Sequence, residues 1–294
     1  MALLIPVKYH DKMYPARIRP RIEEIAGHFD KTEINPNMNY SLHTEYSVGK
    51  RELKSKLLDG LTTIKSSHKN QIPRLWYSKD WAEEFHEFIV RIVGKKDSPS
   101  IIEIHPPFTD YCGSIYEFIN NYTFFELKLR ETYPETEIFI ENRCGTIYRG
   151  GKFLLTKIED LIEFSRILDR NKLKLKVVLD IPQLFAAHYI NLREIKIEEI
   201  KAIMDQIKNI RHNIKGIHLW GKKLSQNNRW SSHIGDLNDY FSGNTEIKKI
   251  FLKKLYEIFD DDKKRYFVPE VNSSNSDLWS IVNDLINVGF RFIS

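Results

Sequence analysis

The sequence is poor in cysteine and contains no long apolar run. Cys112 and Cys144 are the only cysteines in 294 residues, so a disulfide framework is excluded. No stretch of about 18 apolar residues and no charged, apolar and small-residue leader occurs, so we expect a cytoplasmic protein with no membrane partner. Internal repeats, low-complexity tracts and Gly/Ser/Pro-rich linkers are also missing, which predicts a single domain over residues 1–294.

A concentrated basic stripe is missing as well. The formal net charge is +5, and the lysines are spread along amphipathic stretches. Such a charge permits phosphate contacts with nucleic acid but does not by itself predict them. Hydrophobic residues make up 41% of the chain and charged residues 29%, which is typical of a globular protein that buries a full core.

From about residue 98, short β-branched runs alternate with longer amphipathic stretches. The predicted strands are 100–105, 137–141, 175–180, 214–219 and 266–271, and the predicted helices are 114–132, 157–171, 196–211, 245–260 and 275–288. This alternation is typical of βαβ units around a parallel sheet. We therefore predict an α/β fold of the (β/α)8 TIM barrel type.

The first hundred residues follow this pattern less regularly. Residues 3–7 and 39–46 have the composition of strands, and a basic, loop-rich stretch occupies 50–74. A closing strand at 290–294 would bring the number of strands to eight. The predicted barrel is therefore expected to be irregular in its first hundred residues.

Nearly every predicted strand ends in a residue that can bind a metal. In a parallel barrel the carboxyl ends of the strands meet at one mouth, so these side chains would lie together although they are far apart in the sequence. Buried carboxylates are costly unless they are compensated, and cations compensate them. Mixed imidazole and carboxylate ligands favour a divalent metal such as Zn²⁺ or Mn²⁺. The candidate ligands are His43, His105, Glu141, Asp180, His218 and Glu270.

Several short motifs resemble the endonuclease IV family, which belongs with the xylose isomerase-like TIM barrels. The motifs are H-x-x-Y at 43–46, H-P at 105–106, E-N-x-x-G at 141–145, the run LDIPQLFAAHY at 179–189, I-H-L at 217–219 and P-E at 269–270. They follow the order of the family from about residue 40 to residue 271. The resemblance implies a TIM barrel with a divalent metal site.

The resemblance also implies two metal positions that share Glu141. His43 and His105 would complete the first position, and the second would be completed by Asp180, His218 and Glu270. Two metals can clamp both the attacking and the leaving oxygens of a phosphodiester. The expected activity is therefore that of a metal-dependent phosphodiesterase or endonuclease, with DNA or another phosphodiester as substrate. Glu141 and Glu270 are the expected catalytic residues, and Tyr46 and Arg229 are candidate substrate contacts.

The sequence departs from the family at a third metal position. Family members that cut at abasic sites place a histidine where this chain has Gln183, and a D-x-H pair where it has Ser231 and His233. His233 can still serve as a ligand, but an amide and a hydroxyl are poor ligands for a catalytic zinc. We therefore expect two ions rather than three, which puts abasic-site cleavage in doubt. Gln183 is then a candidate substrate contact.

Two other functions stay open. A sugar isomerase or epimerase of the same superfamily keeps a single metal on the quartet Glu141, Asp180, His218 and Glu270, with the two glutamates moving a proton on a small sugar. A barrel that binds nucleic acid or protein without turnover is the third possibility. The number of divalent ions per chain distinguishes the phosphodiesterase from the sugar isomerase or epimerase.

Overall fold

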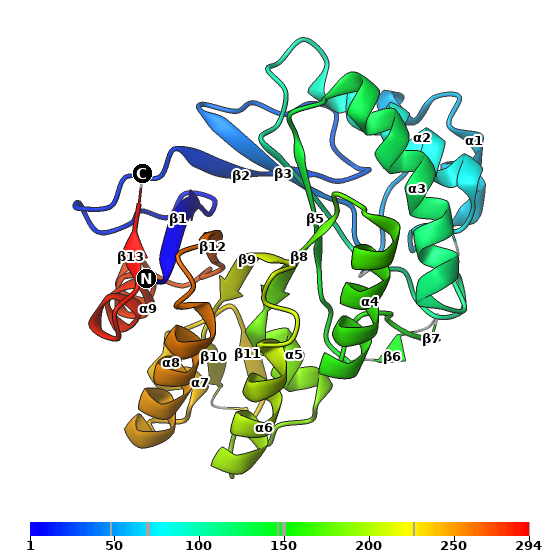
Figure 1. The fold of residues 1–294 in the computed structure, drawn as a ribbon. Coiled ribbons are helices and arrows are strands. Elements are labelled where there is room, and N and C mark those ends of the chain that lie inside the picture. The colour runs from blue at the N-terminus through cyan, green and yellow to red at the C-terminus, as the bar shows by residue number, and fades with distance from the viewer. Residues whose placement is uncertain (48, 69–70, 146, 149–150, 226, 294) are drawn as a thin grey trace.

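Eight parallel strands close into a barrel in the computed structural model (Figure 1), which describes the chain except for residues 48, 69–70, 146, 149–150, 226 and 294. In spatial order the strands are β1 (Leu3–Lys8), β2 (Ile22–Gly27), β3 (Asn39–Thr44), β4 (Ile101–Ile104), β5 (Glu137–Glu141), β8 (Lys176–Asp180), β9 (Ile214–Leu219) and β12 (Lys264–Pro269). β12 pairs in parallel with β1, from Leu3 opposite Lys264 to Pro6 opposite Phe267, and so closes the sheet. The predicted (β/α)8 barrel is confirmed.

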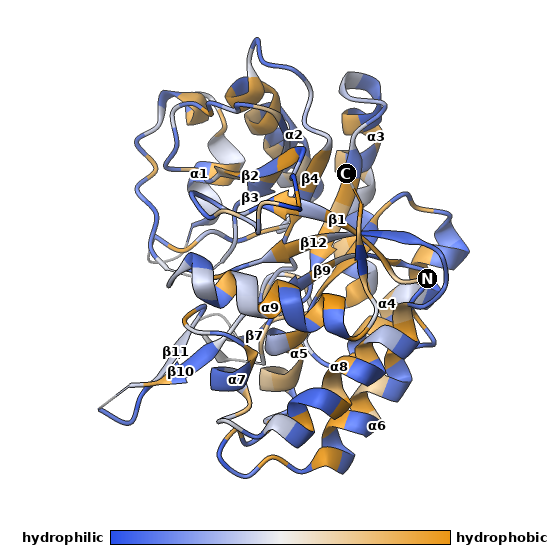
Figure 2. Ribbon diagram, turned by 90° about the vertical axis from the view of Figure 1, so that its left-hand side faces the viewer, coloured by the Kyte–Doolittle hydropathy of each residue, from blue (hydrophilic) through white to orange (hydrophobic). Residues whose placement is uncertain are grey.

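Helices follow most of the strands and cover the barrel with their apolar faces (Figure 2). Serine or asparagine caps begin several of them, since the side chains of Ser78, Ser114, Asn244 and Ser274 each accept a backbone N–H of the first turn. In the part of the chain that the structure describes, no helix is both long and apolar enough to cross a membrane. The helices are α1 (Thr62–Ser67), α2 (Lys79–Val93), α3 (Ile115–Thr132), α4 (Ile158–Asn171), α5 (Ile181–Ala187), α6 (Ile197–Ile207), α7 (Leu237–Tyr240), α8 (Thr245–Phe259) and α9 (Asn275–Asn287), with a 3₁₀ turn, η1, at Lys56–Leu58.

The N-terminal part of the barrel is irregular, as the sequence predicts. Residues 9–21, between β1 and β2, and residues 28–38, between β2 and β3, form no helix. The first of these loops packs on α9 instead. The indole of Trp279 donates to the carbonyl oxygen of Met13 at 2.7 Å, and the Met13 amide donates to Oδ1 of Asn275 at 3.1 Å.

Two strand predictions need correction. Strand β2 was not predicted, because its sequence, IEEIAG, carries two adjacent acids in place of a β-branched run. The predicted closing strand at 290–294 is wrong as a barrel strand. β13 (Arg291–Phe292) pairs only with Leu3 and Leu4, while β12 occupies one edge of β1 and β2 continues along the other. Ser294 lies outside the described residues.

The inside of the barrel is filled beneath the strand ends. Ile101, Phe139 and Val178 form a small buried cluster there, against which Tyr266 packs. Gly216 makes room for this cluster, since a Cβ atom at Gly216 would lie 2.8 Å from a methyl group of Val178. The floor of apolar side chains confines polar chemistry to the carboxyl ends of the strands.

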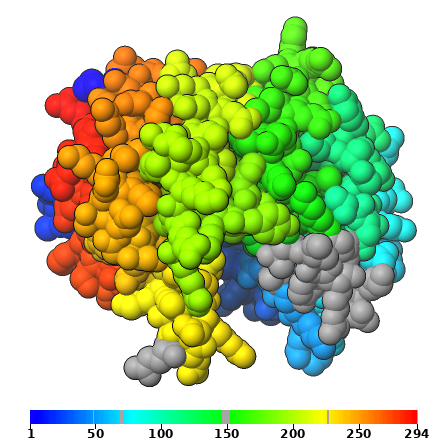
Figure 3. All heavy atoms as spheres, turned by 90° about the horizontal axis from the view of Figure 1, so that it is seen from below, coloured from blue at the N-terminus to red at the C-terminus, as the bar shows by residue number. Residues whose placement is uncertain are grey.

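Two hairpins border this end of the barrel: β6 (Ile147–Tyr148) with β7 (Gly151–Lys152), and β10 (Lys222–Leu224) with β11 (Trp230–Ser232). Seen from below, the surface is hollowed beside the yellow segment that carries β10 and β11, and blue atoms of the N-terminal segment lie at its floor (Figure 3).

Candidate metal centre

The carboxyl ends of the strands bring acids and histidines together, as the sequence predicts. Two groups have ligand atoms that all lie within 4.8 Å of one another. The first group is His43, Glu103, His105 and Glu141, and the second is Glu141, Asp180, His218 and Glu270. Glu141 belongs to both groups. All six predicted ligands are therefore in place, and their binding of metal stays a prediction.

In the first group, two imidazoles and a carboxylate converge. Nε2 of His105 lies 2.9 Å from Nε2 of His43 and 3.0 Å from Oε2 of Glu141. On its other side, Nδ1 of His105 lies 3.1 Å from the carbonyl oxygen of Glu45. Because a carbonyl oxygen only accepts, Nδ1 carries the hydrogen and Nε2 presents its lone pair to the group. A backbone carbonyl that fixes the tautomer in this way is typical of metal-ligating histidines.

The second group is almost completely enclosed. Asp180 and His218 are 0% and 1% exposed. Nδ1 of His218 lies 3.3 Å from Oε1 of Glu270 and 3.8 Å from Oε1 of Glu141. Oδ2 of Asp180 accepts the indole N–H of Trp220 at 2.9 Å, which fixes the orientation of the carboxylate.

Several buried polar atoms in and beside these groups have no hydrogen-bond partner. They are Oε1 of Glu103, Nδ1 of His218, Oε2 of Glu270 and Oε2 of Glu24. Buried polar atoms are nearly always paired, so an unpaired set at one point requires an explanation. Divalent cations fit this set, because imidazole nitrogens and carboxylate oxygens together are ligands for Zn²⁺ and Mn²⁺.

Burial and mutual charge move the pKa values of these groups in opposite directions. Burial raises the pKa of Glu103 to about 7 and, with the charges of Glu141 and Glu270, raises that of Asp180 well above its usual range. Burial also lowers the pKa of His105 to about 4. Burial works against the charged form of His43, but Glu24 overcomes it and raises the pKa of that ring to about 10. The raised pKa values of Glu103, Asp180 and His43 favour bound protons on these side chains, and a divalent cation can replace such protons.

Two acids of the cluster were missed in the sequence. Glu103 precedes His105 by two residues and so faces the same side of β4, one layer deeper in the barrel. Its Oε2 lies 3.6 Å from Nε2 of His218. The two-residue spacing was the available signal. Glu24 accepts a hydrogen bond from Nδ1 of His43 at 3.1 Å, but it lies on the unpredicted strand β2.

Gln183 is part of the carboxylate network. Its Nε2 donates to Oε1 of Glu141 at 2.6 Å and to Oδ2 of Asp180 at 2.7 Å, while its Oε1 accepts the backbone N–H of Cys144 at 3.0 Å. A neutral donor therefore stands between two ligand carboxylates at the position where the resembled family has a histidine.

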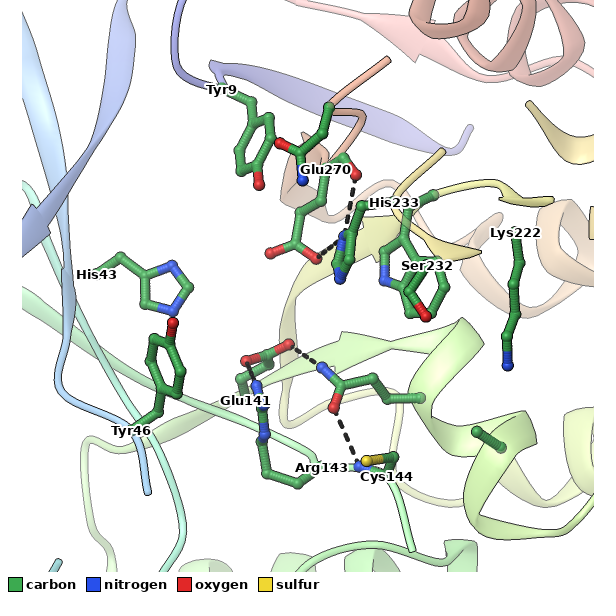
Figure 4. A pocket seen from close by; sticks show the side chains of 14 residues that line it. Tyr9, His43, Tyr46, Glu141, Arg143, Cys144, Lys222, Ser232, His233 and Glu270 are labelled. Carbon is green, nitrogen blue, oxygen red and sulfur yellow. Dashed lines mark hydrogen bonds and ion pairs between the residues drawn. The ribbon is translucent and has the colours of Figure 1, made fainter. Parts of the chain in front are cut away.

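A cavity of about 460 Å³ opens above the two groups. Figure 4 shows His43 and Tyr46 on one side of it and Ser232 and Lys222 on the other, with Glu141 and Glu270 between them. The lining residues are Tyr9, His43, Tyr46, Glu141, Arg143, Cys144, Gln183, Ala186, Trp220, Lys222, Ser232, His233, Glu270 and Asn272.

The cavity wall carries positive charge that the sequence did not single out. Arg143 pairs with Oε2 of Glu141 at 2.9 Å, and Lys222 lies across the cavity. The guanidinium groups of Arg51 and Arg143 lie 4.8 and 5.7 Å from the ring centre of Tyr46 and hold this ring at the wall.

Two other predicted residues, His233 and Arg229, belong to none of the ligand groups found among the described residues. His233 stacks on Trp220 with ring centres 4.3 Å apart, and its Nδ1 faces the carbonyl oxygen of Glu270 at 3.1 Å. Among the described residues, the ligand-type groups do not include His233. Arg229 is exposed on the β10–β11 hairpin and does not line the cavity. On the same hairpin Ser232, rather than Ser231, lines the cavity.

Comparison with known proteins gives similarity in structure only. No protein-family model and no curated protein matches the sequence. The solved structures that match include a D-tagatose 3-epimerase-like protein, with 14% identity over 93% of this chain and 91% of that chain and a TM-score of 0.44. They also include the structure described as AsfvAP:AG, with 10% identity, 85% coverage of this chain, 84% of that chain and a TM-score of 0.49.

A xylose isomerase domain protein from Planctomyces limnophilus also matches, with 15% identity, 71% coverage of this chain, 62% of that chain and a TM-score of 0.36. At such identities and scores no activity is transferred from any of these proteins. The chemistry proposed below rests on the residues of this chain.

Proposed function

We propose that the chain is a metal-dependent phosphodiesterase that acts on DNA or another phosphodiester. The observation that carries the proposal is the sharing of Glu141 between two ligand groups. Oε2 of Glu141 faces His105 in the first group, and Oε1 faces His218 in the second. A carboxylate with one oxygen in each group holds two positions at a short, fixed separation.

Two divalent cations, if held by these groups, would supply the charge that stabilises both the attacking and the leaving oxygens of a phosphodiester. The remaining wall residues suit an anionic, planar substrate. Arg143 and Lys222 place positive charge on the cavity wall, where a phosphate group requires it. The ring of Tyr46 is held in place by Arg51 and Arg143, and a base or sugar can stack on it.

The catalytic roles of Glu141 and Glu270 follow from their position. Both carboxylates belong to ligand groups and also line the cavity, so each would contact both the cations and the substrate. Gln183 bridges the carboxylates of Glu141 and Asp180 through its two donated hydrogen bonds. We place Gln183 as a positioning residue for these carboxylates.

The test combines a metal count with two kinds of assay. Purified protein loaded with Zn²⁺ or Mn²⁺ is expected to hold two ions per chain and to hydrolyse bis(p-nitrophenyl) phosphate or single- or double-stranded DNA. Asp180→Asn is expected to abolish this hydrolysis while the protein stays folded. A wild type that binds one ion and leaves every phosphodiester intact would overturn the proposal.

A sugar isomerase or epimerase is the second candidate. The observation that favours it is that Glu141, Asp180, His218 and Glu270 form a complete ligand group by themselves. One cation on this quartet would polarise a carbonyl, and the amide of Gln183 in the cavity could bind a sugar hydroxyl. Turnover of a keto-sugar by a chain that holds one ion per molecule would establish this function in place of the first.

A further inference from the structure

A third group of ligand atoms lies on the side of the cavity that faces β2. It consists of Glu24, His43 and Glu270, whose ligand atoms also lie within 4.8 Å of one another. His43 joins it to the first ligand group, and Glu270 joins it to the second. The third group therefore completes a ring of three neighbouring groups in which each pair shares one residue.

Glu24 has one carboxylate oxygen that nothing in the described chain satisfies. Its side chain is 5% exposed, and Oε1 accepts from Nδ1 of His43 at 3.1 Å. Oε2 is buried and has no hydrogen-bond partner. A buried anionic oxygen without a partner is costly, so its presence beside other ligand atoms points to a cation.

Glu270, like Glu24, has one carboxylate oxygen near a histidine nitrogen and one without a hydrogen-bond partner. Its side chain is 6% exposed, and Oε1 faces Nδ1 of His218 at 3.3 Å in the second group. Oε2 has no hydrogen-bond partner, although His233 lies 3.6 Å away. Oε2 faces His233, and Oε1 lies on the side of His43 (Figure 4).

We propose that the carboxylates of Glu24 and Glu270 hold a third divalent cation between them. His43 does not supply a ligand nitrogen to it. With a cation in the first group, the ring of His43 is neutral and has one lone pair, on the Nε2 that faces His105, while Nδ1 carries the hydrogen donated to Glu24. The third cation is therefore bound by oxygen atoms alone on the protein side.

An oxygen-only site selects a hard, exchangeable cation. Two carboxylates and several waters are the usual ligands of Mg²⁺, and Mn²⁺ accepts the same ligands. Tyr9 lies near Glu270 (Figure 4), and Asn272 also lines the cavity, so the bound waters would meet polar side chains. We expect this position to bind Mn²⁺ more weakly than the two groups that contain imidazole.

This position differs from the degenerate one at Gln183, Ser231 and His233, because it uses Glu24 on β2. It rests on the proposed function, since Glu270 also serves the second of the two cations proposed there. The proposed function and the third position can still be tested separately, because the first concerns two tightly bound cations and the second concerns one weakly bound cation.

The experiment is a Mn²⁺ titration of the 294-residue chain after chelation, with free Mn²⁺ measured by electron paramagnetic resonance. The wild type is expected to bind two Mn²⁺ tightly and about one more in a weaker class. Glu24→Gln is expected to lose the weaker class, with affinity lowered at least roughly tenfold, because the amide replaces the anionic ligand. The amide oxygen still accepts from His43, so the two tight ions are expected to remain.

The matched control is Glu23→Gln on the same strand. The carboxylate of Glu23 accepts the backbone N–H groups of Asn37 and Met38 and belongs to none of the ligand groups, so the weaker class is expected to stay. Circular dichroism confirms that each variant is folded.

Saturation of the wild type at two ions would overturn the proposal. So would a Glu24→Gln protein that loses a tight ion and keeps the weak one, because Glu24 would then only orient His43. A wild type without the tight pair, but with a weak ion that Glu24→Gln removes, would support the third position and contradict the proposed function.

Discussion

Asn142 and Asp180 exchange two hydrogen bonds across neighbouring strand ends. The backbone N–H of Asp180 donates to Oδ1 of Asn142 at 2.8 Å, and Nδ2 of Asn142 donates to the carbonyl oxygen of Asp180 at 3.0 Å. The amide side chain thus replaces the ladder hydrogen bonds just where β5 ends. Because Asp180 is both a candidate ligand and the N-cap of α5, this contact fixes the ligand by its backbone.

Replacement of Asn142 by leucine is expected to cost about 1–3 kcal/mol of unfolding free energy, since the buried backbone N–H of Asp180 loses its partner. The carbonyl oxygen of Asp180, the N-cap of α5, still accepts the first hydrogen bond of the helix. Urea unfolding in the absence of metal measures this cost. The control is Asn171→Leu, at an exposed helix end, which is expected to cost less than about 1 kcal/mol. Equal losses of unfolding free energy in the two variants would show that the hydrogen bonds of Asn142 do not stabilise the fold more than an exposed residue does.

The shared position of Glu141 predicts unequal losses of metal. Glu141→Gln removes a ligand from both groups and is expected to abolish both tight ions, whereas Asp180→Asn is expected to abolish only one. Glu137→Gln is the control. Its carboxylate lies earlier on the same strand, accepts the hydroxyl of Tyr266 at 2.8 Å, and takes part in none of the ligand groups. Elemental analysis of the three variants decides. Loss of the same number of ions in both ligand variants would contradict the sharing of Glu141.

The candidate ligands at the carboxyl ends of the strands could be predicted, because an apolar run followed by His, Asp or Glu is visible in the sequence. His105, Asp180 and His218 all stand at such a boundary, and the barrel topology alone brings them together. Glu103 was missed because an acid inside a strand looks like a solvated residue unless its face is known. That face depends on strand register, which local sequence does not determine.

The remaining errors have a tertiary cause. Strand β2 is held by pairing on both edges, with β1 and with β3, so it forms despite a composition that local propensity disfavours. Residues 291–292 do form strand pairs with β1, but the position that closes the barrel is already taken by β12. The placement of Arg229 away from the cavity follows from the course of a hairpin, which a motif match does not show.

A buried ion pair far from the site predicts a pH dependence of stability. Arg265 is 1% exposed and donates to both carboxylate oxygens of Asp261 at 2.8 Å. Burial alone would raise the pKa of Asp261, but the hydrogen bonds and charge of Arg265 hold it below its ordinary value of 3.8. The stabilisation is therefore complete above this value and is lost as the pH falls through the lower pKa of the folded state.

Asp261→Asn is accordingly expected to cost roughly 3 kcal/mol, because it leaves a buried guanidinium without its anion. The difference in unfolding free energy between wild type and variant is expected to be constant from pH 7 to about pH 5 and to shrink below about pH 4. Asp205→Asn breaks an exposed pair with Lys254 and is expected to change stability by less than about 1 kcal/mol. A difference that already declines above pH 5 would refute the assignment.

Gly221 permits a close approach of two backbone segments at the cavity rim. A methyl group at Gly221 would lie 2.2 Å from the carbonyl oxygen of Gly235, so Gly221→Ala must push this segment aside. We expect a loss of about 1–3 kcal/mol, measured by thermal unfolding. Gly113→Ala is the control, since its nearest new contact is a side-chain oxygen of Glu117 at 3.5 Å. Unchanged stability in Gly221→Ala would indicate a different path for the rim.

The degenerate position at Gln183 offers a gain-of-binding test. Gln183→His places an imidazole between the carboxylates of Glu141 and Asp180, which the amide now bridges. A third metal position also needs a carboxylate, and the structure places that carboxylate at a different residue from the one that the motif indicates. Ser231 matches the family by spacing, but Ser232 is the residue that lines the cavity beside His233.

The double variant Gln183→His with Ser232→Asp is therefore expected to bind about one more tight divalent ion than the wild type, because an imidazole and a carboxylate join His233 as ligands. Gln183→His with Ser231→Asp is the matched control and is expected to gain none, since the new acid would point away from the cavity. Metal analysis and cleavage of an abasic duplex are measured together. In a phosphodiesterase the extra ion is expected to bring cleavage with it. A gain in the Ser231 variant alone would show that the hairpin turns the opposite face toward the site, and no gain in either variant would show that His233 is not available as a ligand.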